Sequence, residues 1–600
     1  MTKIIDRNNI DFLVFDVFKL RELLGHGRYA DHDTESITSV LDLAEQIATN
    51  DLWPHLSKSD REEPVLKNGT VRIIDQAISA LGVLRDAGFF SARFDTKLGG
   101  MQLPVVINNA CNGMFKGANI GTMSYMGLTQ AAAGLLNTYG TTDLKVRFMM
   151  PLLQGKFFGT MCLSEPNVGS SLGDIITKAT PQSDGSYFVT GSKMWISGGD
   201  HNAAENIIHL VLARTPGSVN GVKGLSLFAV PKIKVNNDGS LGDNNGVSVA
   251  GLNHKMGYRG TSNCLLNFGE ITDCQGHLVG ELGKGLLAMF HMMNESRISV
   301  GIGGAMLANV AYRVALNYAK ERKQGRKLDD KNSSNKPVAI IEHGDVRRML
   351  MRQKALSEGA VALCLYSGML VDLEILSADK IERQRYTDML EVFTPIVKAW
   401  STEFGVQANK LAIQVMGGYG YTRDFPVEQL YRDNRLNMIH EGTNGIQALD
   451  LLGRKLVMDE GRALKTFAAE IRADLASLNE TTNLRPFIDK LTNILTDVEE
   501  WLTQVRSMLQ SGEKSGVLTN AMPFLHAFGH LAVGWLWIKQ SSIASNLLDK
   551  SSPRQSDSFL QGKITTCQYF FEYEIPEAEA WLKVVKTNPG AVLGMAEDSF

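Results

Sequence analysis

A single carboxylate, Glu441, stands in a segment whose composition suits acid–base chemistry. It follows the apolar pair Met438 and Ile439 and precedes a helix predicted to start near Gly445. A carboxylate on an apolar shoulder loses hydration, which raises its pKa and suits it to act as a general base. A Glu near a helix start is also stabilised by the helix dipole alone, so the local sequence leaves both interpretations open.

Two further segments combine turn residues with short hydroxyl side chains. The string MCLSEPNVGSSLGD (161–174) leaves a predicted strand through a turn, and its serines and backbone N–H groups suit a flat polar ring or a phosphate. The string KMWISGG (193–199) places Trp195 where an indole could stack on an aromatic ligand, with the Ser197 hydroxyl at the ligand's edge. Taken singly, the first string is more typical of a polar loop and the second of a core tryptophan.

A helix predicted over 291–327 carries glycines in its middle and a basic end. Gly301, Gly303 and Gly304 each lower helix propensity by about 1 kcal/mol relative to Ala, so we expect a neighbouring helix or ligand to approach closely there. The resulting GxG string is not a dinucleotide fingerprint, because no strand precedes it. The basic end fits either pairing with the helix dipole or a diphosphate clamp. Its residues are Lys320, Arg322, Lys323, Arg326 and Lys327.

Several function classes lack support in the sequence. Nucleophile-elbow, zinc-protease, calcium-loop and P-loop motifs are missing, and we expect no metal. The six cysteines are scattered singly, which predicts neither disulfides nor a zinc site and fits a reducing compartment. With 61 Lys and Arg against 64 Asp and Glu, the chain lacks the basic excess typical of nucleic-acid binders.

Targeting signals are also missing from the sequence. We find no signal or transit peptide, and no apolar run near the roughly 18–20 residues that span a bilayer. The expected location is the cytoplasm, with peripheral association with the inner membrane left open.

The elements that must position these residues change type along the chain. Helical periodicity over 1–155, with 1–34 as an extension, gives way to short apolar runs between turn signals over 156–285. Helical periodicity returns over 286–460 and continues over 461–600. We therefore predict an α+β multidomain fold: an N-terminal helical domain, a central β-barrel or sandwich domain, a helical bundle carrying Glu441, and an additional C-terminal helical domain.

Local patterns set further expectations. A helix is predicted over 34–50 with Thr34 as its cap, and another over 71–87 with Val71 on its apolar stripe. The runs 206–213 and 225–230 are predicted strands, and 527–538 is predicted to be part of a buried helix.

Taken together, in this order and spacing, five strings resemble the acyl-CoA dehydrogenase family over roughly residues 35–458. They are MCLSEPNVGSS, KMWISGG, AKERKQGRK, QVMGGYGYTRDFPVEQLYRD and IHEGTNGIQALDLLGRK. The added block 461–600 and the insertion before IIEHGDVRRML resemble the C-terminally extended subgroup, which includes 3-methylmercaptopropionyl-CoA dehydrogenases and bacterial broad-range fatty acyl-CoA dehydrogenases.

The resemblance implies an FAD-dependent α,β-dehydrogenation of an acyl-CoA thioester to a trans-2-enoyl-CoA. The implied electron acceptor is an electron-transfer flavoprotein. The implied assembly is a homodimer, or a dimer of dimers, with FAD at the subunit interface.

The resemblance also assigns residues. Glu441 matches the catalytic base, and the thioester carbonyl would be polarised by the Glu441 backbone N–H and a flavin ribityl hydroxyl. The implied cofactor-binding residues are Met161, Cys162, Leu163, Ser164, Gly169, Ser170, Trp195, Ile196, Ser197, Arg322, Gln324, Gln414, Gly417, Gly418 and Thr443. The implied substrate-binding residues are Ser170, Asn294, Arg297, Glu441 and Gly442.

Three positions depart from the family pattern, and three other functions stay open. His440 stands where many members carry Tyr, Gly445 replaces a common Gln, and Asn294 replaces a common Asp. An acyl-CoA oxidase would share nearly every motif. A DNA-associated flavoprotein is disfavoured by the 13 basic and 16 acidic residues of 461–600, and a non-catalytic flavin-binding scaffold is disfavoured by Glu441.

Overall fold

The computed structural model describes residues 3–329, 332, 334–478, 482–550 and 554–600, without the side chains of His291, Asn294 and Thr482. The chain forms two compact units. Residues 1–41, 104–113 and 300–600 make one, here called the helical unit, and residues 42–103 and 114–299 make the other, here called the sheet unit. The division into four domains stays a prediction.

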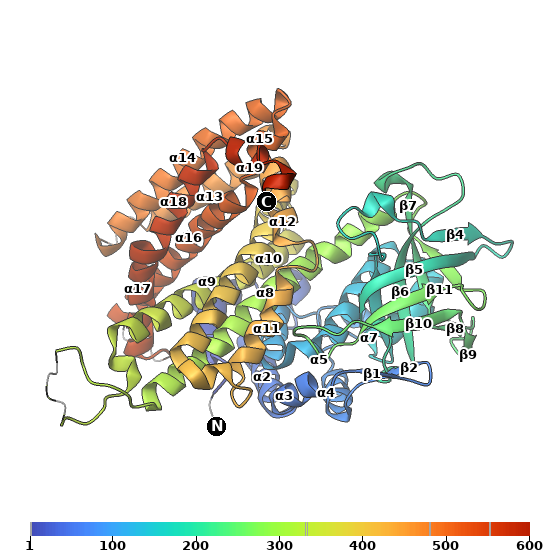
Figure 1. The fold of residues 1–600 in the computed structure, drawn as a ribbon, viewed down its shortest axis with the longest axis horizontal. Helices are drawn as coiled ribbons and strands as arrows, with labels where there is room; N and C mark the ends of the chain where they lie inside the picture. The colour runs from blue at the N-terminus through green and yellow to red at the C-terminus, as the bar shows by residue number, and fades with distance from the viewer. Residues whose placement is uncertain (1–2, 330–331, 333, 479–481, 551–553) are drawn as a thin grey trace. The chain divides into compact units, whose positions relative to one another are not determined.

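The sheet unit is built on one sheet that contains eight of the strands in the described residues. The strands are β3 (Phe157–Cys162), β4 (Lys178–Pro181), β5 (Tyr187–Ser197), β6 (Asn206–Arg214), β7 (Leu225–Pro231), β10 (Val247–Leu252), β11 (Asn263–Phe268) and β12 (Gln275–Val279). Their order is β10-β11-β5-β12-β7-β6-β3, with β4 beside β5 and β6 (Figure 1). Strands β6 and β7 are almost wholly buried, as expected of central strands covered on both faces, and both confirm the sequence prediction.

Two small hairpins lie outside this sheet, one before it in the chain and one inserted between β7 and β10. They are β1 (Val65–Lys67) with β2 (Thr70–Arg72), and β8 (Ile233–Val235) with β9 (Leu241–Asn244).

The helices account for most of the remaining chain. The long ones are α2 (Thr34–Ile47), α4 (Asp75–Asp86), α5 (Val105–Tyr139), α8 (Gly285–Glu321), α9 (Gly344–Leu376), α10 (Lys380–Met416), α11 (Val427–Asn437), α13 (Arg462–Ser477), α14 (Arg485–Gln510), α16 (Ala521–Asp549), α17 (Asp557–Tyr569) and α18 (Ile575–Val585). The short ones are α1 (Arg7–Asp11), α3 (Leu56–Arg61), α6 (Thr142–Leu144), α7 (Met150–Leu153), α12 (Asn444–Asp450), α15 (Lys514–Leu518) and α19 (Gly590–Leu593). This arrangement confirms the predicted α+β fold with helical parts before and after a central β module.

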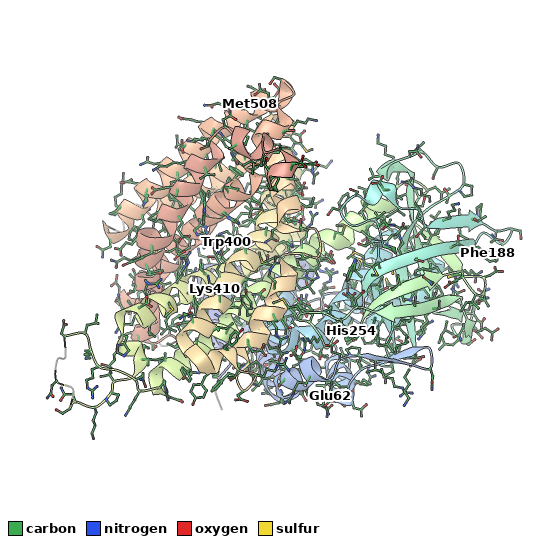
Figure 2. All side chains as sticks on the ribbon, in the orientation of Figure 1. Glu62, Phe188, His254, Trp400, Lys410 and Met508 are labelled. Carbon is green, nitrogen blue, oxygen red and sulfur yellow. The ribbon has the colours of Figure 1, made fainter. Side chains whose placement is uncertain are left out.

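The core of the helical unit is a set of closely packed long helices. Helices α9 and α10 lie side by side (Figure 1), and a three-residue connection makes them antiparallel neighbours. A Cβ at Gly301 of α8 would lie 2.6 Å from the Val397 carbonyl oxygen of α10. A Cβ at Gly304 would lie 3.0 Å from Thr402 Cγ2, so the close approach expected at these glycines is confirmed. Trp400 of α10 lies fully buried inside this bundle (Figure 2).

The C-terminal block is joined to the bundle by buried polar contacts. Helix α16 is buried over most of its length, as predicted for 527–538. Trp400 Nε1 donates to His530 Nδ1 of α16 at 2.9 Å. Lys563 of α17 is fully buried and donates to Glu358 Oε2 of α9 at 2.7 Å and to Asn9 of α1. Three segments far apart in the sequence therefore meet at one ammonium group.

Two predictions about the first hundred residues are wrong in detail. Val71 lies in strand β2, and the following helix begins only at Asp75, because Asn68 and Gly69 both have positive φ and close the two-residue hairpin that Asn-Gly favours. Thr34 is not the cap of α2. Asp33 precedes it and accepts a hydrogen bond from the Ser36 N–H at 2.8 Å, so the helix starts one residue earlier than its predicted cap allows.

The expectation about membrane-spanning segments is also corrected. By length and composition alone, three helices among the described residues would suffice to cross a bilayer: α8, α9 and α16. In this fold 83%, 72% and 83% of their respective apolar windows are buried inside the protein. Their side chains are apolar because the helices pack against protein on most sides.

The buried pair Lys563–Glu358 gives a prediction about stability. Burial by itself raises the pKa of Glu358, but the ammonium groups of Lys354 and Lys563 outweigh it and lower that pKa to about 2. Because the folded pKa lies below the unfolded one, this carboxylate stabilises the fold above about pH 4.5 and the contribution is lost as the pH falls toward 2. We expect Glu358→Gln to lower the unfolding free energy by roughly 3 kcal/mol at pH 7, because Lys563 would stay buried without its counter-charge.

The difference between wild type and Glu358→Gln should shrink as the pH is lowered from 7 to 3 in thermal melts. The exposed i,i+3 pair Arg348–Asp345 supplies the control, since Asp345→Asn should change stability by well under 1 kcal/mol. A destabilisation by Glu358→Gln no larger than that of the control would contradict the role given to the pair.

Candidate functional site

The indole of Trp195 is the most conspicuous feature of strand β5. Trp195 has a φ of +64°, which is unusual for a non-glycine residue, and its side chain is 58% exposed. The pairing with β11 explains both facts: Ile196 faces Cys264 and Lys193 faces Leu266, so β5 has one extra residue in between. Such a bulge re-aims a side chain. The interpretation of Trp195 as a core tryptophan is therefore wrong.

The two motif segments of the sheet unit lie next to one another. The backbone N–H of Met194 donates to the Ser164 carbonyl at 3.0 Å, which joins the turn after β3 to the strand that carries Trp195. Ser164 and Ser197 are half-buried, and Asn263 Nδ2 donates to Ser197 Oγ at 3.3 Å. An exposed aromatic face with nearby hydroxyl groups is the arrangement expected of a site for a flat ring with polar edges.

Not every side chain of these segments faces outward. Cys162 and Ile196 are buried in one hydrophobic core cluster, and Leu163 packs in another, so their side chains do not face a ligand at the surface. Met161 is half-buried. Gly169 and Ser170 are exposed on the turn.

A buried ion pair that the sequence analysis did not single out joins the same two segments. Lys193 Nζ donates to Glu165 Oε1 at 3.0 Å and to the Leu163 carbonyl at 2.9 Å, and both charged side chains are almost fully buried. Glu165 lies inside MCLSEPNVGSS and Lys193 begins KMWISGG. The sequence indicates such a pair only through an acidic residue in one motif and a basic residue in the other. The spacing of the two motifs along the chain does not show that these residues pair.

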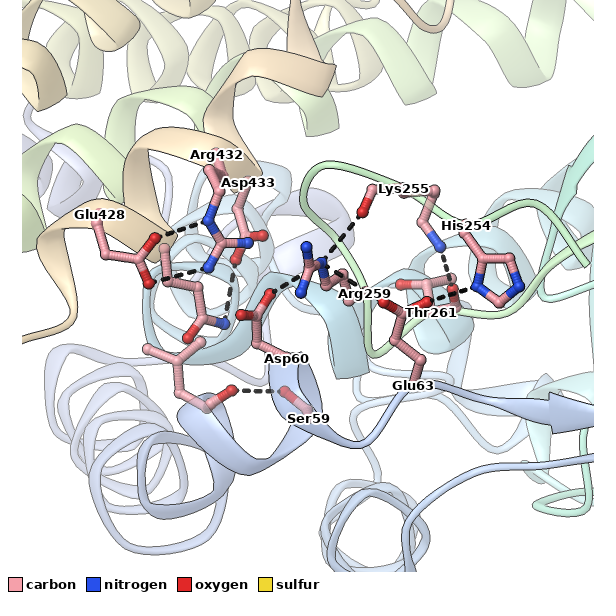
Figure 3. Close-up of polar contacts among 12 residues, drawn as sticks. Ser59, Asp60, Glu63, His254, Lys255, Arg259, Thr261, Glu428, Arg432 and Asp433 are labelled. Atoms are coloured by element: carbon pink, nitrogen blue, oxygen red, sulfur yellow. Dashed lines mark hydrogen bonds and ion pairs between the residues drawn. The ribbon is translucent and has the colours of Figure 1, made fainter. Parts of the chain in front are cut away.

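The loop before β11 braces this region from the other side. Gly198 N–H donates to the Ser262 carbonyl at 2.8 Å, directly after the Trp195 segment. Arg259 holds the loop to helix α3 and the residues just after it, with its Nε 3.9 Å from Asp60 Oδ1 and 3.6 Å from Glu63 Oε1 (Figure 3). The segment that follows Trp195 is therefore hydrogen-bonded to a loop that is itself held by ion pairs.

Glu441 occupies an unusual backbone position in the helical unit. It lies in the turn between α11 and α12 with a φ of +55°, and Gly442 follows with a φ of +81°. Gln447 Nε2 donates to the Glu441 carbonyl at 3.2 Å, and the Thr443 side chain caps α12 by accepting from the Ile446 N–H. The Glu441 side chain is half-buried, with Oε2 shielded from solvent. The predicted helix start near Gly445 is confirmed, since α12 begins at Asn444.

The remaining predicted cofactor residues of the helical unit form an exposed group. Helix α8 ends at Glu321, whereas the sequence predicts a helix that continues to residue 327. Arg322 and Gln324 therefore lie beyond the helix and not on its last turns. The Arg322 guanidinium stands 5.8 Å from the ring centroid of Tyr419. Gln414, Gly417 and Gly418 are exposed at the end of α10. A Cβ at Gly417 or Gly418 would meet no other atom within 4 Å, which leaves this backbone open to a large ligand.

Two substrate positions and two departures remain. Arg297 is buried in α8, whereas the side chain of Asn294 lies outside the described residues. His440 Nε2 lies 3.1 Å from Asn437 Oδ1. A Cβ at Gly445 would meet no atom nearer than Thr443 Oγ1 at 3.8 Å, so space alone does not require glycine there.

Comparison with protein families accounts for most of the chain. Residues 160–271 match the model for the acyl-CoA dehydrogenase middle domain, and residues 283–456 match that for the acyl-CoA dehydrogenase C-terminal domain. Residues 467–596 match a third model, described as acetyl-CoA dehydrogenase C-terminal like.

Individual relatives extend the similarity to nearly the full length. The chain is 34% identical over 562 residues, 92% of each chain, to the 3-methylmercaptopropionyl-CoA dehydrogenase of Ruegeria pomeroyi. It is 32% identical, over 98% of each chain, to the broad-specificity linear acyl-CoA dehydrogenase FadE5 of Mycobacterium tuberculosis. The fold also matches a solved structure of Caenorhabditis elegans ACDH-11 in complex with C11-CoA, with a TM-score of 0.75, 19% identity and coverage of 98% and 95%.

These matches define an FAD-dependent oxidoreductase that acts on acyl-CoA thioesters. The protein belongs to the acyl-CoA dehydrogenase family. The identification from the five motif strings is confirmed, including the C-terminally extended subgroup.

The residues present fit FAD, the cofactor of this family. A crystal structure of an acyl-CoA dehydrogenase from Bacillus anthracis complexed with FAD shares the fold, with a TM-score of 0.72, 20% identity and coverage of 92% and 88%. In this chain the exposed indole of Trp195 offers a face for a tricyclic ring. The exposed guanidinium of Arg322 and the open glycines at 417 and 418 offer a charge and a backbone surface for a phosphate.

The backbone of Glu441 generates a second prediction. A left-handed φ costs a residue with a Cβ about 1 kcal/mol, whereas glycine adopts it freely. We therefore expect Glu441→Gly to be more stable than Glu441→Ala by about 1 kcal/mol in thermal or urea unfolding. Glu460, exposed and also at a φ of +55°, should show the same order, whereas Glu500 on the exposed face of α14 should show the opposite order. An alanine variant that is the more stable at Glu441 would show that the turn relaxes.

Proposed function

We propose that Glu441 is the base with which this acyl-CoA dehydrogenase removes a proton from the substrate Cα. The observation that carries the proposal is the left-handed turn at Glu441, which fixes one half-buried carboxylate on a strained backbone. Strain of this kind is retained where the surroundings impose it, and it clusters at functional positions. The glutamate also stands in the string IHEGTNG, where the family has its base.

The chain's own residues would supply orientation and charge stabilisation. The Cα–H bond of a thioester is too weakly acidic to ionise in water unless the carbonyl oxygen is polarised. The backbone N–H of Glu441 is the donor that this chain would contribute, and one such donor is typically worth about 2.7–4 kcal/mol in kcat. Bound FAD would supply the acceptor for the hydride that leaves Cβ. Trp195 and Ser197 would hold the ring, and Arg297 would help to orient the thioester.

We further propose that the protein works as a homodimer, or a dimer of dimers, with FAD at the subunit interface. The support is the exposure of Arg322, Gln324, Gln414 and Gly417, because a surface that receives a cofactor from a neighbouring subunit must be open in the single chain. Light scattering of the holoenzyme tests the assembly. A monomeric holoenzyme would contradict it.

A cytoplasmic location, with peripheral association with the inner membrane as the alternative, is proposed from the sequence alone and is tested by cell fractionation.

The role of Glu441 leads to a third prediction. Glu441→Gln keeps the shape and the backbone but loses the base, so FAD should stay bound while its bleaching by acyl-CoA slows by at least about 10³-fold. Stopped-flow absorbance under anaerobic conditions measures the rate. Glu460→Gln is the matched control, since Glu460 has the same φ and lies outside the site motifs, and it should bleach at the wild-type rate. Wild-type bleaching by Glu441→Gln would overturn the assignment.

The electron acceptor is the subject of a fourth prediction. We propose that an electron-transfer flavoprotein reoxidises the enzyme, as in the dehydrogenase branch of the family. After anaerobic reduction by acyl-CoA, the flavin should reoxidise within seconds when an electron-transfer flavoprotein is added, and at least 100-fold more slowly in air. Rapid reoxidation in air with stoichiometric peroxide would identify the protein as an acyl-CoA oxidase instead.

A further inference from the structure

The buried pair Glu165–Lys193 joins two segments that the proposed function assigns to cofactor and substrate. Glu165 begins the turn that carries Gly169 and Ser170, and Lys193 lies two residues before Trp195. The side chain of Lys193 is fully buried and that of Glu165 is 3% exposed. Both charged groups are therefore withdrawn from the surface at which the Trp195 indole is exposed.

Glu165 also closes the turn on itself. Its Oε2 accepts from the Ile176 N–H at 2.9 Å, and its Oε1 accepts from the Thr177 N–H at 3.0 Å and from Thr177 Oγ1 at 2.5 Å. Two backbone hydrogen bonds between Glu165 and Val168, at 2.9 and 3.0 Å, close the start of the same turn. The Glu165 carboxylate therefore joins the two ends of the segment 166–175 through its hydrogen bonds to Ile176 and Thr177.

Lys193 then fixes this closed turn to the sheet. Its ammonium group donates to Glu165 and to the Leu163 carbonyl, on a strand already joined to the turn by the Met194–Ser164 bond. Although burial raises the pKa of Glu165, the ammonium and the donors around the carboxylate lower it below its usual range. Burial lowers the pKa of Lys193, and the Glu165 carboxylate opposes that shift, so each group favours the charged form of the other.

Stability alone does not account for such a pair. Burying two charges costs desolvation that their attraction barely repays, and a well-packed apolar pair would often serve the fold as well. Charged groups with directional hydrogen-bond partners allow only one register between the two segments. Apolar side chains do not impose such a restriction.

We propose that Glu165 and Lys193 are positioning residues for the dehydrogenation: they hold the turn with Ser164 and Ser170 in register with Trp195 and Ser197. This inference rests on the proposed function, because it takes these residues to contact FAD and acyl-CoA. It predicts that disturbing the pair changes affinity for cofactor and substrate more than it changes the chemical step at Glu441.

The test uses the full-length holoenzyme with Glu165→Gln, Lys193→Met and the double variant that neutralises both charges. The control is Glu358→Gln, which breaks a Lys–Glu pair of equal burial in the helical unit. FAD affinity is measured by reconstitution of the apoenzyme, the ring environment by the visible flavin spectrum, and KM and kcat with a panel of acyl-CoAs.

We expect each single variant to bind FAD at least tenfold more weakly, with a shifted flavin spectrum, a KM raised at least fivefold and a kcat within threefold of wild type. Glu358→Gln should melt at a lower temperature but leave the FAD Kd and the KM within twofold. The double variant should regain melting temperature without regaining FAD affinity.

The inference fails if the single variants keep FAD affinity and KM within twofold of wild type, or if the double variant recovers both. The double variant decides the question if the single variants do not fold. Failure of the proposed function looks different: the wild type would bind FAD yet no acyl-CoA would bleach it, while the affinity comparison would still test the pair.

Discussion

The backbone of this protein is forced into the left-handed region at both residues that the proposed chemistry relies on most. Trp195 and Glu441 each pay a conformational cost that ordinary residues avoid, and each is held there by contacts on either side. At Trp195 the cost is imposed by a bulge between two paired stretches of β5 and β11. At Glu441 it is imposed by a turn in which the Glu441 carbonyl accepts a bond from Gln447 and the nearby Thr443 caps α12. The rest of each unit can be understood as the support that keeps these two positions from relaxing.

Buried charge has a comparable role in both units. Glu165–Lys193 links a turn to a strand in the sheet unit, and Glu358–Lys563 links a C-terminal helix to the bundle in the helical unit. In both cases one partner of the pair makes a further hydrogen bond: Glu165 accepts from the Thr177 N–H, and Lys563 donates to Asn9. Such groups contribute little net stability, yet they penalise every arrangement in which their partners are misplaced. They therefore select one register among several that apolar packing alone would permit.

Much of the fold follows from local pattern. The change from helical periodicity to short apolar runs located the β module, and the glycines of α8 located a close helix contact, because both depend on neighbours in sequence. The hairpin at Asn68 and Gly69 also had a local signal, which the helical stripe through Val71 obscured. The end of α8 at Glu321 had none, since the basic residues beyond it are equally suited to a helix or a loop.

The site could be predicted in its parts but not in its geometry. Motif strings identified Glu441, Trp195 and the serine-rich turn as residues of interest. Their resemblance to a family supplied roles that spacing alone could not. The exposure of Trp195 required knowing that β11 would oppose β5 with one residue fewer. The pairing of Glu165 with Lys193 required the fold of the turn between them. Both depend on contacts between strands that are far apart in sequence.

The apolar character of helix α9 has a consequence for how the chain is made. Its side chains are covered in part by α16, whose Trp537 Nε1 donates to the Ala355 carbonyl, and a Cβ at Gly359 would lie 2.7 Å from Val533 Cγ1. During translation α9 leaves the ribosome long before residue 521, where α16 begins. At about 5–20 residues per second the delay is on the order of ten seconds. Throughout that interval a helix apolar enough by composition to enter a bilayer lacks its contacts with α16, so its apolar side chains stay exposed unless another part of the chain or a chaperone covers them.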